Sequence, residues 1–134
     1  MKNLFEKGDQ KHLKVAVTDE KLARFDAGLV HPVYSTFALG KDAEWACRLF
    51  VLDMKEPGEE GVGAALTIEH VSPAVLGSEV LITATIESIV KRTITCSWEA
   101  KVRDRLVAKG TQVQKIVIKE RFDTYIAELK SQMG

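Results

Sequence analysis

The chain has 134 residues, of which 46% are hydrophobic, and its 19 basic residues balance its 19 acidic residues to a formal net charge of zero. This length lies near the commonest domain size, and the apolar content can fill a core, so we expect one domain over residues 1–134. The balanced charge argues against binding to nucleic acid or to an anionic membrane, and no apolar run reaches transmembrane length.

The two cysteines and the first residues are typical of a protein in a reducing compartment. Cys47 and Cys96 lack metal-ligand spacing and lie in apolar patterns, which is typical of free buried thiols in a reducing environment. The first residues lack the apolar core of a signal peptide. We therefore expect a cytoplasmic protein without a metal site.

The first expected element is a short strand with one buried face. Leu13, Val15 and Val17 alternate with polar or small residues, which is the period of a strand. Residues 19–31 are polar and irregular, so they predict a loop or lid that Pro32 closes.

A long buried helix is expected next, over residues 38–54. Apolar side chains surround it almost completely, which is typical of a helix enclosed by the rest of a protein. Pro57-Gly58 ends it. Its polar residues lie on one narrow stripe: Lys41, Glu44, Arg48 and Lys55.

Most of the remaining chain is rich in Val, Ile and Thr and predicts four long strands, over residues 62–71, 79–90, 93–105 and 106–118. Their short connections indicate antiparallel hairpins. Apolar residues change from odd to even positions along the last strand, which predicts a bulge at Gly110. A terminal helix with one apolar face is expected over residues 120–132.

This order of elements predicts an α+β protein. A helix that is apolar on nearly all sides needs a sheet wrapped around it, which is the hotdog fold: an antiparallel sheet curled around one long buried helix, here with a C-terminal helix. A cone-shaped α+β fold with helices on one face of the sheet also fits the pattern.

Three residues carry a candidate chemistry. Thr36, Glu44 and His70 supply a hydroxyl, a carboxylate and an imidazole, which together can hydrolyse an activated acyl group. His70 ends the apolar face of its strand, where a histidine that only bonds to backbone is the structural alternative.

Glu44 and Thr36 have structural alternatives of their own. Glu44 precedes Arg48 by four residues, the favourable order for a solvated helical ion pair, although a carboxylate also suits the N-terminal part of this apolar helix. Thr36, like Ser35, is a candidate helix cap. A straight helix from Thr36 would separate it from Glu44 by roughly 12 Å, so direct contact requires Thr36 to lie in a preceding loop.

Residues 33–122 resemble the fluoroacetyl-CoA thioesterase-like family of hotdog acyl-CoA thioesterases. The resemblance rests on ordered motifs, of which Glu44-Trp45-Ala46-Cys47 is the most specific; the others are Val33-Tyr34-Ser35-Thr36, Glu56-Pro57-Gly58-Glu59, Gly63, His70 and Gly77. It implies that Thr36, Glu44 and His70 are catalytic and that Gly63 lies beside the acyl group.

The resemblance also implies a homodimer that binds acyl-CoA between its subunits, without a cofactor. The reaction would be hydrolysis of a small or medium acyl-CoA, or a related thioester, to the free acid and thiol. His70 would transfer protons, Glu44 would activate water or attack the thioester, and Thr36 would position the carboxylate and the substrate.

The sequence departs from the fluoroacetyl-specific pattern near the expected lid. Ala27 and Val30 stand where that relative has phenylalanines, and Phe37, a candidate substrate-binding residue, stands where it has glycine. We therefore expect thioester hydrolysis without selectivity for fluoroacetate.

One alternative function is hydration of an acyl-CoA, but the spaced Asp…His motif of hotdog hydratases is not evident. The other is a non-catalytic protein that binds acyl-CoA or another small ligand.

Overall fold

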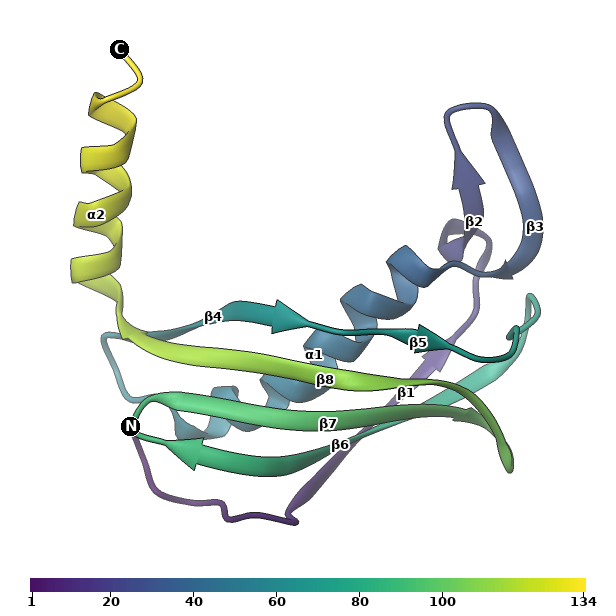
Figure 1. The fold of residues 1–134 in the computed structure, drawn as a ribbon, viewed down its shortest axis with the longest axis horizontal. Coiled ribbons are helices and arrows are strands. Elements are labelled where there is room, and N and C mark those ends of the chain that lie inside the picture. Colours follow the sequence, from purple (N-terminus) through teal and green to yellow (C-terminus); the bar gives the residue numbers. More distant parts are fainter.

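A curled antiparallel sheet forms most of the molecule in this computed structural model, which describes residues 1–134 (Figure 1). The strands lie in the order β1 (Gln10–Ala16), β6 (Glu79–Val90), β7 (Thr93–Val102), β8 (Arg105–Ile118) and β4 (Glu59–Leu66). The short β5 (Glu69–His70) also pairs with β8. Every pairing is antiparallel, as the short connections predicted.

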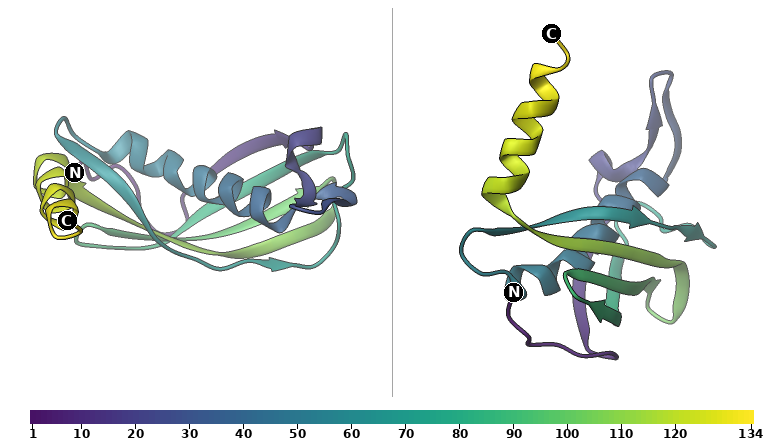
Figure 2. Two further views of the ribbon diagram at one scale, coloured as in Figure 1. Left: turned by 90° about the horizontal axis from the view of Figure 1, so that it is seen from above. Right: turned by 60° about the vertical axis from the view of Figure 1, so that its left-hand side comes forward.

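The long helix α1 (Thr36–Met54) lies along the concave face of this sheet (Figure 2). Its N-cap is Ser35, whose Oγ accepts a hydrogen bond from the Ala38 N–H. The helix buries residues spaced three and four apart, namely Leu39, Gly40, Ala43, Ala46, Cys47, Phe50, Val51 and Met54. This is the predicted hotdog arrangement, and it differs from the cone-shaped alternative because the sheet wraps around the helix.

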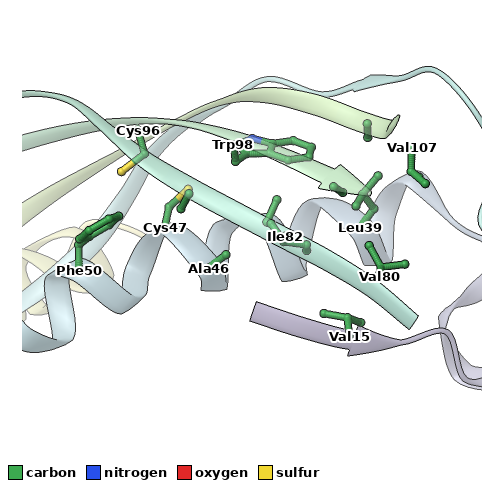
Figure 3. Packing of buried hydrophobic residues seen from close by; sticks show 14 of the residues in the cluster. Val15, Leu39, Ala46, Cys47, Phe50, Val80, Ile82, Cys96, Trp98 and Val107 are labelled. Atoms are coloured by element: carbon green, nitrogen blue, oxygen red, sulfur yellow. The ribbon is translucent and has the colours of Figure 1, made fainter. Parts of the chain in front are cut away.

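The core lies between α1 and the inward faces of the central strands (Figure 3). Alternate residues of β6 and β7 point inward, because successive side chains of a strand face opposite sides. They are Val80, Ile82, Ala84 and Ile86 on β6, and Ile94, Cys96, Trp98 and Ala100 on β7. Both cysteines are free and buried, and the proximity of Cys96, together with burial, raises the pKa of the Cys47 thiol.

The expected loop over residues 19–31 is instead a short 3₁₀ turn (Asp19–Lys21) followed by the start of a hairpin. The hairpin joins β2 (Leu22–Phe25) to β3 (Gly28–Tyr34) as a separate two-stranded sheet that projects from the body (Figure 1). Gly28 adopts a positive φ of 110° at its turn. Most of its residues are exposed on both faces, so the sequence carries no alternation of the kind that reveals a half-buried strand.

The predicted bulge in β8 lies at Val107 rather than at Gly110. Ala100 pairs with Ala108 while Lys101 pairs with Leu106, which leaves Val107 as the additional residue. Gly110 instead permits a close approach of two backbones, since a Cβ there would lie 1.9 Å from the Thr67 carbonyl oxygen.

The C-terminal helix α2 (Lys119–Ser131) confirms the last expected element. It follows β8 directly and extends away from the sheet, beyond the β4–β5 edge (Figures 1 and 2). Its apolar residues are exposed: Phe122, Tyr125, Ile126 and Leu129. Neither helix has the length and hydropathy needed to cross a membrane.

Candidate functional site

Thr36 and His70 meet although 34 residues separate them in sequence. Thr36 is the first residue of α1, and its Oγ1 lies 3.0 Å from Nδ1 of His70 on β5. Because Ser35 caps the helix, the Thr36 hydroxyl is free to make this bond. The histidine therefore bonds to a side chain rather than to the backbone partner of the structural alternative.

The second ring nitrogen of His70 has no partner within the chain. Nε2 is buried and has no hydrogen-bond partner in the protein. In a neutral imidazole one nitrogen donates and the other accepts, so the Thr36 hydroxyl at Nδ1 influences whether Nε2 carries the proton. Pairing of His70 with Ala108 holds the histidine backbone in place.

Glu44 does not form the ion pair with Arg48 that was its structural alternative. Arg48 donates instead to the Gly61 carbonyl oxygen at 2.8 Å and to Glu60 Oε1 at 2.7 Å. The backbone N–H of Gly61, together with Lys55 and Arg48, lowers the pKa of the Glu60 carboxyl to about 2, against the opposing effect of burial. Arg48 thus pairs with Glu60, and Glu44 has no salt bridge.

The Glu44 carboxylate lies against the backbone of β4. A Cβ at Gly63 would come within 2.0 Å of Glu44 Oε1, so any larger residue would displace the carboxylate. Gln112 Nε2 donates to the same oxygen at 3.4 Å. Because α1 is continuous from Thr36, Glu44 lies two helical turns further along it, and no hydrogen bond joins the two residues.

Two depressions meet at Glu44. The first has a volume of about 390 Å³ and a charged wall, formed by Lys41, Asp42, Glu44, Trp45, Arg48, Gly63 and Gln114. The second, of about 340 Å³, is more apolar and is lined by Thr36, Phe37, Gly40, Lys41, Glu44, Leu66 and Ile68. The Thr36 hydroxyl and the Glu44 carboxylate therefore border one space, and Phe37, which is 86% exposed, borders the same depression.

A larger hollow of about 690 Å³ lies elsewhere and contains none of Thr36, Glu44 and His70. Its walls are mainly hydroxyl-bearing and charged side chains of β6, β7 and β8. We take the depressions at Glu44 as the candidate site, because the more apolar one is bordered both by Glu44 and by Thr36, whose hydroxyl bonds to His70.

The sequence analysis missed two buried glutamines beneath Glu44. Gln112 and Gln114 are 0% and 1% exposed and occupy inward positions of β8. The sequence contained an indication of them. Gln112 and Gln114 alternate in step with Ile116, so they lie on the same inward face of β8, whose other residues are apolar. A polar side chain at a core position is the observation that would have identified them.

Comparisons with known proteins agree with this geometry. Residues 17–120 match the model of a family described as FlK, fluoroacetyl-CoA-specific thioesterase. A fluoroacetyl-CoA thioesterase from Streptantibioticus cattleyicolor is 28% identical over 87 residues, or 63% of this chain. The match spans 61% of that relative's length.

Two solved structures share the fold. A thioesterase superfamily member from Thermus thermophilus superposes with a TM-score of 0.93 at 29% identity, covering 98% of this chain and 97% of that one. A hot-dog-like protein from Thermanaerovibrio acidaminovorans has a TM-score of 0.85 at 21% identity, over 92% of both chains. The second comparison bears on the fold alone.

Proposed function

The chain belongs to the FlK family of fluoroacetyl-CoA-specific thioesterases, and from this premise we propose that it hydrolyses small or medium acyl-CoA, or related thioesters, to the free acid and thiol. One observation carries the proposal: Glu44, a carboxylate without a cation partner, borders the same depression as Thr36, whose hydroxyl bonds to His70. A carboxylate of this kind can act as a base or as a nucleophile.

In the proposed reaction the three residues have separate roles. Glu44 either takes a proton from the attacking water or attacks the thioester carbonyl itself and forms a mixed anhydride that water then cleaves. His70 transfers protons, and the departing thiolate receives one to leave as the thiol. Thr36 positions His70 and the substrate. Backbone amides near Gly63 are candidates for stabilising the oxyanion, because glycine permits close approach.

The acyl group is proposed to enter the more apolar depression, beside Phe37, Leu66 and Ile68. Each methylene buried in an apolar pocket contributes about 1–3 kcal/mol to discrimination. Ala27 and Val30 lie on the projecting hairpin and are smaller than the phenylalanines of the fluoroacetyl-specific pattern. Neither residue lines the two depressions at Glu44 within one chain. We propose that their small side chains leave room for longer acyl chains and remove any special preference for fluoroacetyl-CoA.

We also propose that the protein acts as a homodimer in the cytoplasm. The strand β4 pairs only with β8, so its outer edge is open, and residues 63–67 along it are exposed. The helix α2 stands beyond this edge with its apolar face uncovered (Figure 1). A second copy that pairs along the edge would cover both surfaces. The free thiols of the core suit a reducing compartment.

The deciding experiment measures thiol release from acetyl-, fluoroacetyl-, butyryl- and hexanoyl-CoA, with Glu44→Gln as the control variant. We expect turnover by the natural protein, with kcat/KM higher for butyryl-CoA and longer chains than for acetyl-CoA. We expect no preference for fluoroacetyl-CoA beyond its greater intrinsic reactivity.

Two results would contradict the proposal in different ways. Tight binding of acyl-CoA without thiol release would establish the non-catalytic alternative. Turnover with strong selectivity for fluoroacetyl-CoA would keep the thioesterase function but overturn the argument from Ala27 and Val30.

A further inference from the structure

Gln112 provides the only hydrogen bond that the Glu44 carboxylate receives. The glutamine is fully buried on β8, where it pairs with Cys96 on one side and Leu66 on the other. Its Nε2 lies 3.4 Å from Glu44 Oε1 and also donates to the Val113 carbonyl oxygen at 3.1 Å. The two hydrogens of one amide group thus join the sheet backbone to the carboxylate.

The other half of the Gln112 side chain has no partner. Its Oε1 is buried and accepts no hydrogen bond. An unpaired buried acceptor destabilises a fold, so packing alone favours an apolar residue at this position. An ionised carboxylate can only accept, and it therefore holds the amide with Nε2 toward Glu44 and Oε1 away from it. The Val113 carbonyl oxygen favours the same orientation, because it also accepts from Nε2. Neither acceptor satisfies Oε1, so core packing does not favour a polar residue at this position.

The surroundings of Glu44 leave this one bond to orient it. The Gly63 backbone limits Oε1 on one side, and Gln112 Nε2 lies 3.7 Å from the point that a Cβ at Gly63 would occupy. Arg48, the cation one turn further along the helix, is held by Gly61 and Glu60. Oε1 therefore lies close to both the β4 backbone and the Gln112 amide, while Oε2 accepts no hydrogen bond from the protein.

We propose that Gln112 is a positioning residue for Glu44: its amide holds Oε1 and thereby directs Oε2 toward the water or acyl carbon that reacts. Gln112 acts through Glu44, since its burial keeps it from the substrate. The inference rests on the proposed thioesterase function and adds a component that the sequence motifs do not contain.

Gln112→Met tests this role, because methionine has a similar length but cannot donate or accept in the same way. We expect kcat to fall about 10- to 100-fold, as is typical when a reacting group is misplaced, with KM changed by less than about threefold. The melting temperature should stay the same or rise, because the substitution removes the unpartnered Oε1. A purely structural glutamine would give the opposite pattern, a lower melting temperature with normal kcat.

Ile116→Val is the matched control, since Ile116 is equally buried and lies on the same face of β8. It removes one methylene from the core and should lower the melting temperature slightly without changing kcat. A fall in kcat for this control would mean that any disturbance of β8 affects turnover, and would overturn the specific role of Gln112.

A double-mutant cycle separates this inference from the proposed function. In a Glu44→Gln background, Gln112→Met should cost no further activity, because the group that it positions is already gone. Wild-type hydrolysis by Glu44→Gln would overturn both the catalytic carboxylate and the role of Gln112. An impaired Glu44→Gln together with normal turnover by Gln112→Met, or an equal loss in both backgrounds, would overturn this inference and leave the proposed function intact.

Discussion

At the scale of single residues, the site depends on contacts that one atom can disturb. The Glu44 carboxylate occupies the space that a side chain at Gly63 would need, and the Thr36 hydroxyl bonds to His70 while Ser35 serves as the cap. These contacts concern the ends of side chains rather than the core. Substitutions here should therefore separate activity from stability.

Replacement of His70 or Thr36 tests the proton-transfer pair. We expect His70→Ala to lower kcat by about 10²- to 10⁴-fold, the usual contribution of a general acid or base. Thr36→Ala should cost roughly 10-fold if the hydroxyl only positions the imidazole. Steady-state kinetics on an acyl-CoA substrate, with circular dichroism to verify folding, checks both values. Normal turnover by folded His70→Ala would remove the histidine from the mechanism.

Gly63→Ala tests the packing of the carboxylate. An added Cβ would lie 2.0 Å from Glu44 Oε1, and the flexible carboxylate would move rather than the exposed strand. We expect kcat/KM to fall about 10- to 100-fold with little change in melting temperature. Ala64→Ser, at the neighbouring exposed position of β4, is the control and should keep normal kinetics. Equal activity of Gly63→Ala and wild type would show that Glu44 does not need its present position.

At the scale of elements, a partly buried cluster anchors the hairpin to the helix. The Tyr34 hydroxyl, at the end of β3, donates to Asp42 Oδ2 on α1 at 2.5 Å, and Lys21 Nζ lies 2.8 Å from the same oxygen. Tyr34 is 1% exposed. Burial, reinforced by the Asp42 carboxylate, raises the pKa of Tyr34 above its ordinary value of 10.0. The base of the hairpin is therefore firmly attached although its tip projects into solvent.

The raised pKa of Tyr34 predicts a loss of stability at alkaline pH. Its contribution is fully present below pH 10, where the phenol is protonated in both the folded and the unfolded chain. Above pH 10 the unfolded chain loses the proton while the folded chain keeps it, so the free energy of unfolding falls by up to about 1.4 kcal/mol per pH unit.

Tyr34→Phe isolates this effect, because phenylalanine cannot ionise. Urea unfolding from pH 8 to pH 11 should find the variant less stable at pH 8, by about 1–3 kcal/mol for a lost hydrogen bond to a charged group. The difference from wild type should narrow as the pH rises above 10. A constant difference over this range would contradict the assignment.

At the scale of the whole molecule, the open sheet edge and the two projecting elements form a surface that nothing covers in the single chain. The β4–β5 edge lies between α2 and the β2–β3 hairpin, which both extend past it (Figures 1 and 2). Gly63 and Leu66, which border the two depressions, belong to this same edge. Assembly and activity are therefore expected to depend on each other.

Ile126→Glu tests the assembly. A charge in the centre of the exposed apolar face of α2 should weaken the proposed dimer, because association would bury an unpaired carboxylate. Light scattering at micromolar concentration should give a dimer for wild type and a smaller mass for the variant. Thr124→Glu, on the opposite face of the helix, is the control and should remain dimeric. A strictly monomeric wild type would refute the homodimer.

The regular elements were predictable because their signals are local. The apolar residues of the long helix and the alternation in β6 and β7 identify which faces are buried, and the short connections imply antiparallel pairing. The β2–β3 hairpin escaped prediction because neither of its faces is buried. The bulge was predicted at Gly110 but lies at Val107. The change of the apolar residues from odd to even positions identifies only the region of a bulge, not the residue.

The sequence of this protein, with its resemblance to a known family, was sufficient to predict the curled sheet and the central helix. It was also sufficient to identify Thr36, Glu44 and His70 as candidates. Tertiary contacts alone established that Thr36 pairs with His70, that Glu60 and Gly61 draw Arg48 away from Glu44, and that Gln112 donates to the carboxylate from 68 residues away. The physical reason is the range of the interactions. Periodicity reflects burial within one element, whereas hydrogen-bond partners depend on how elements distant in sequence are brought together.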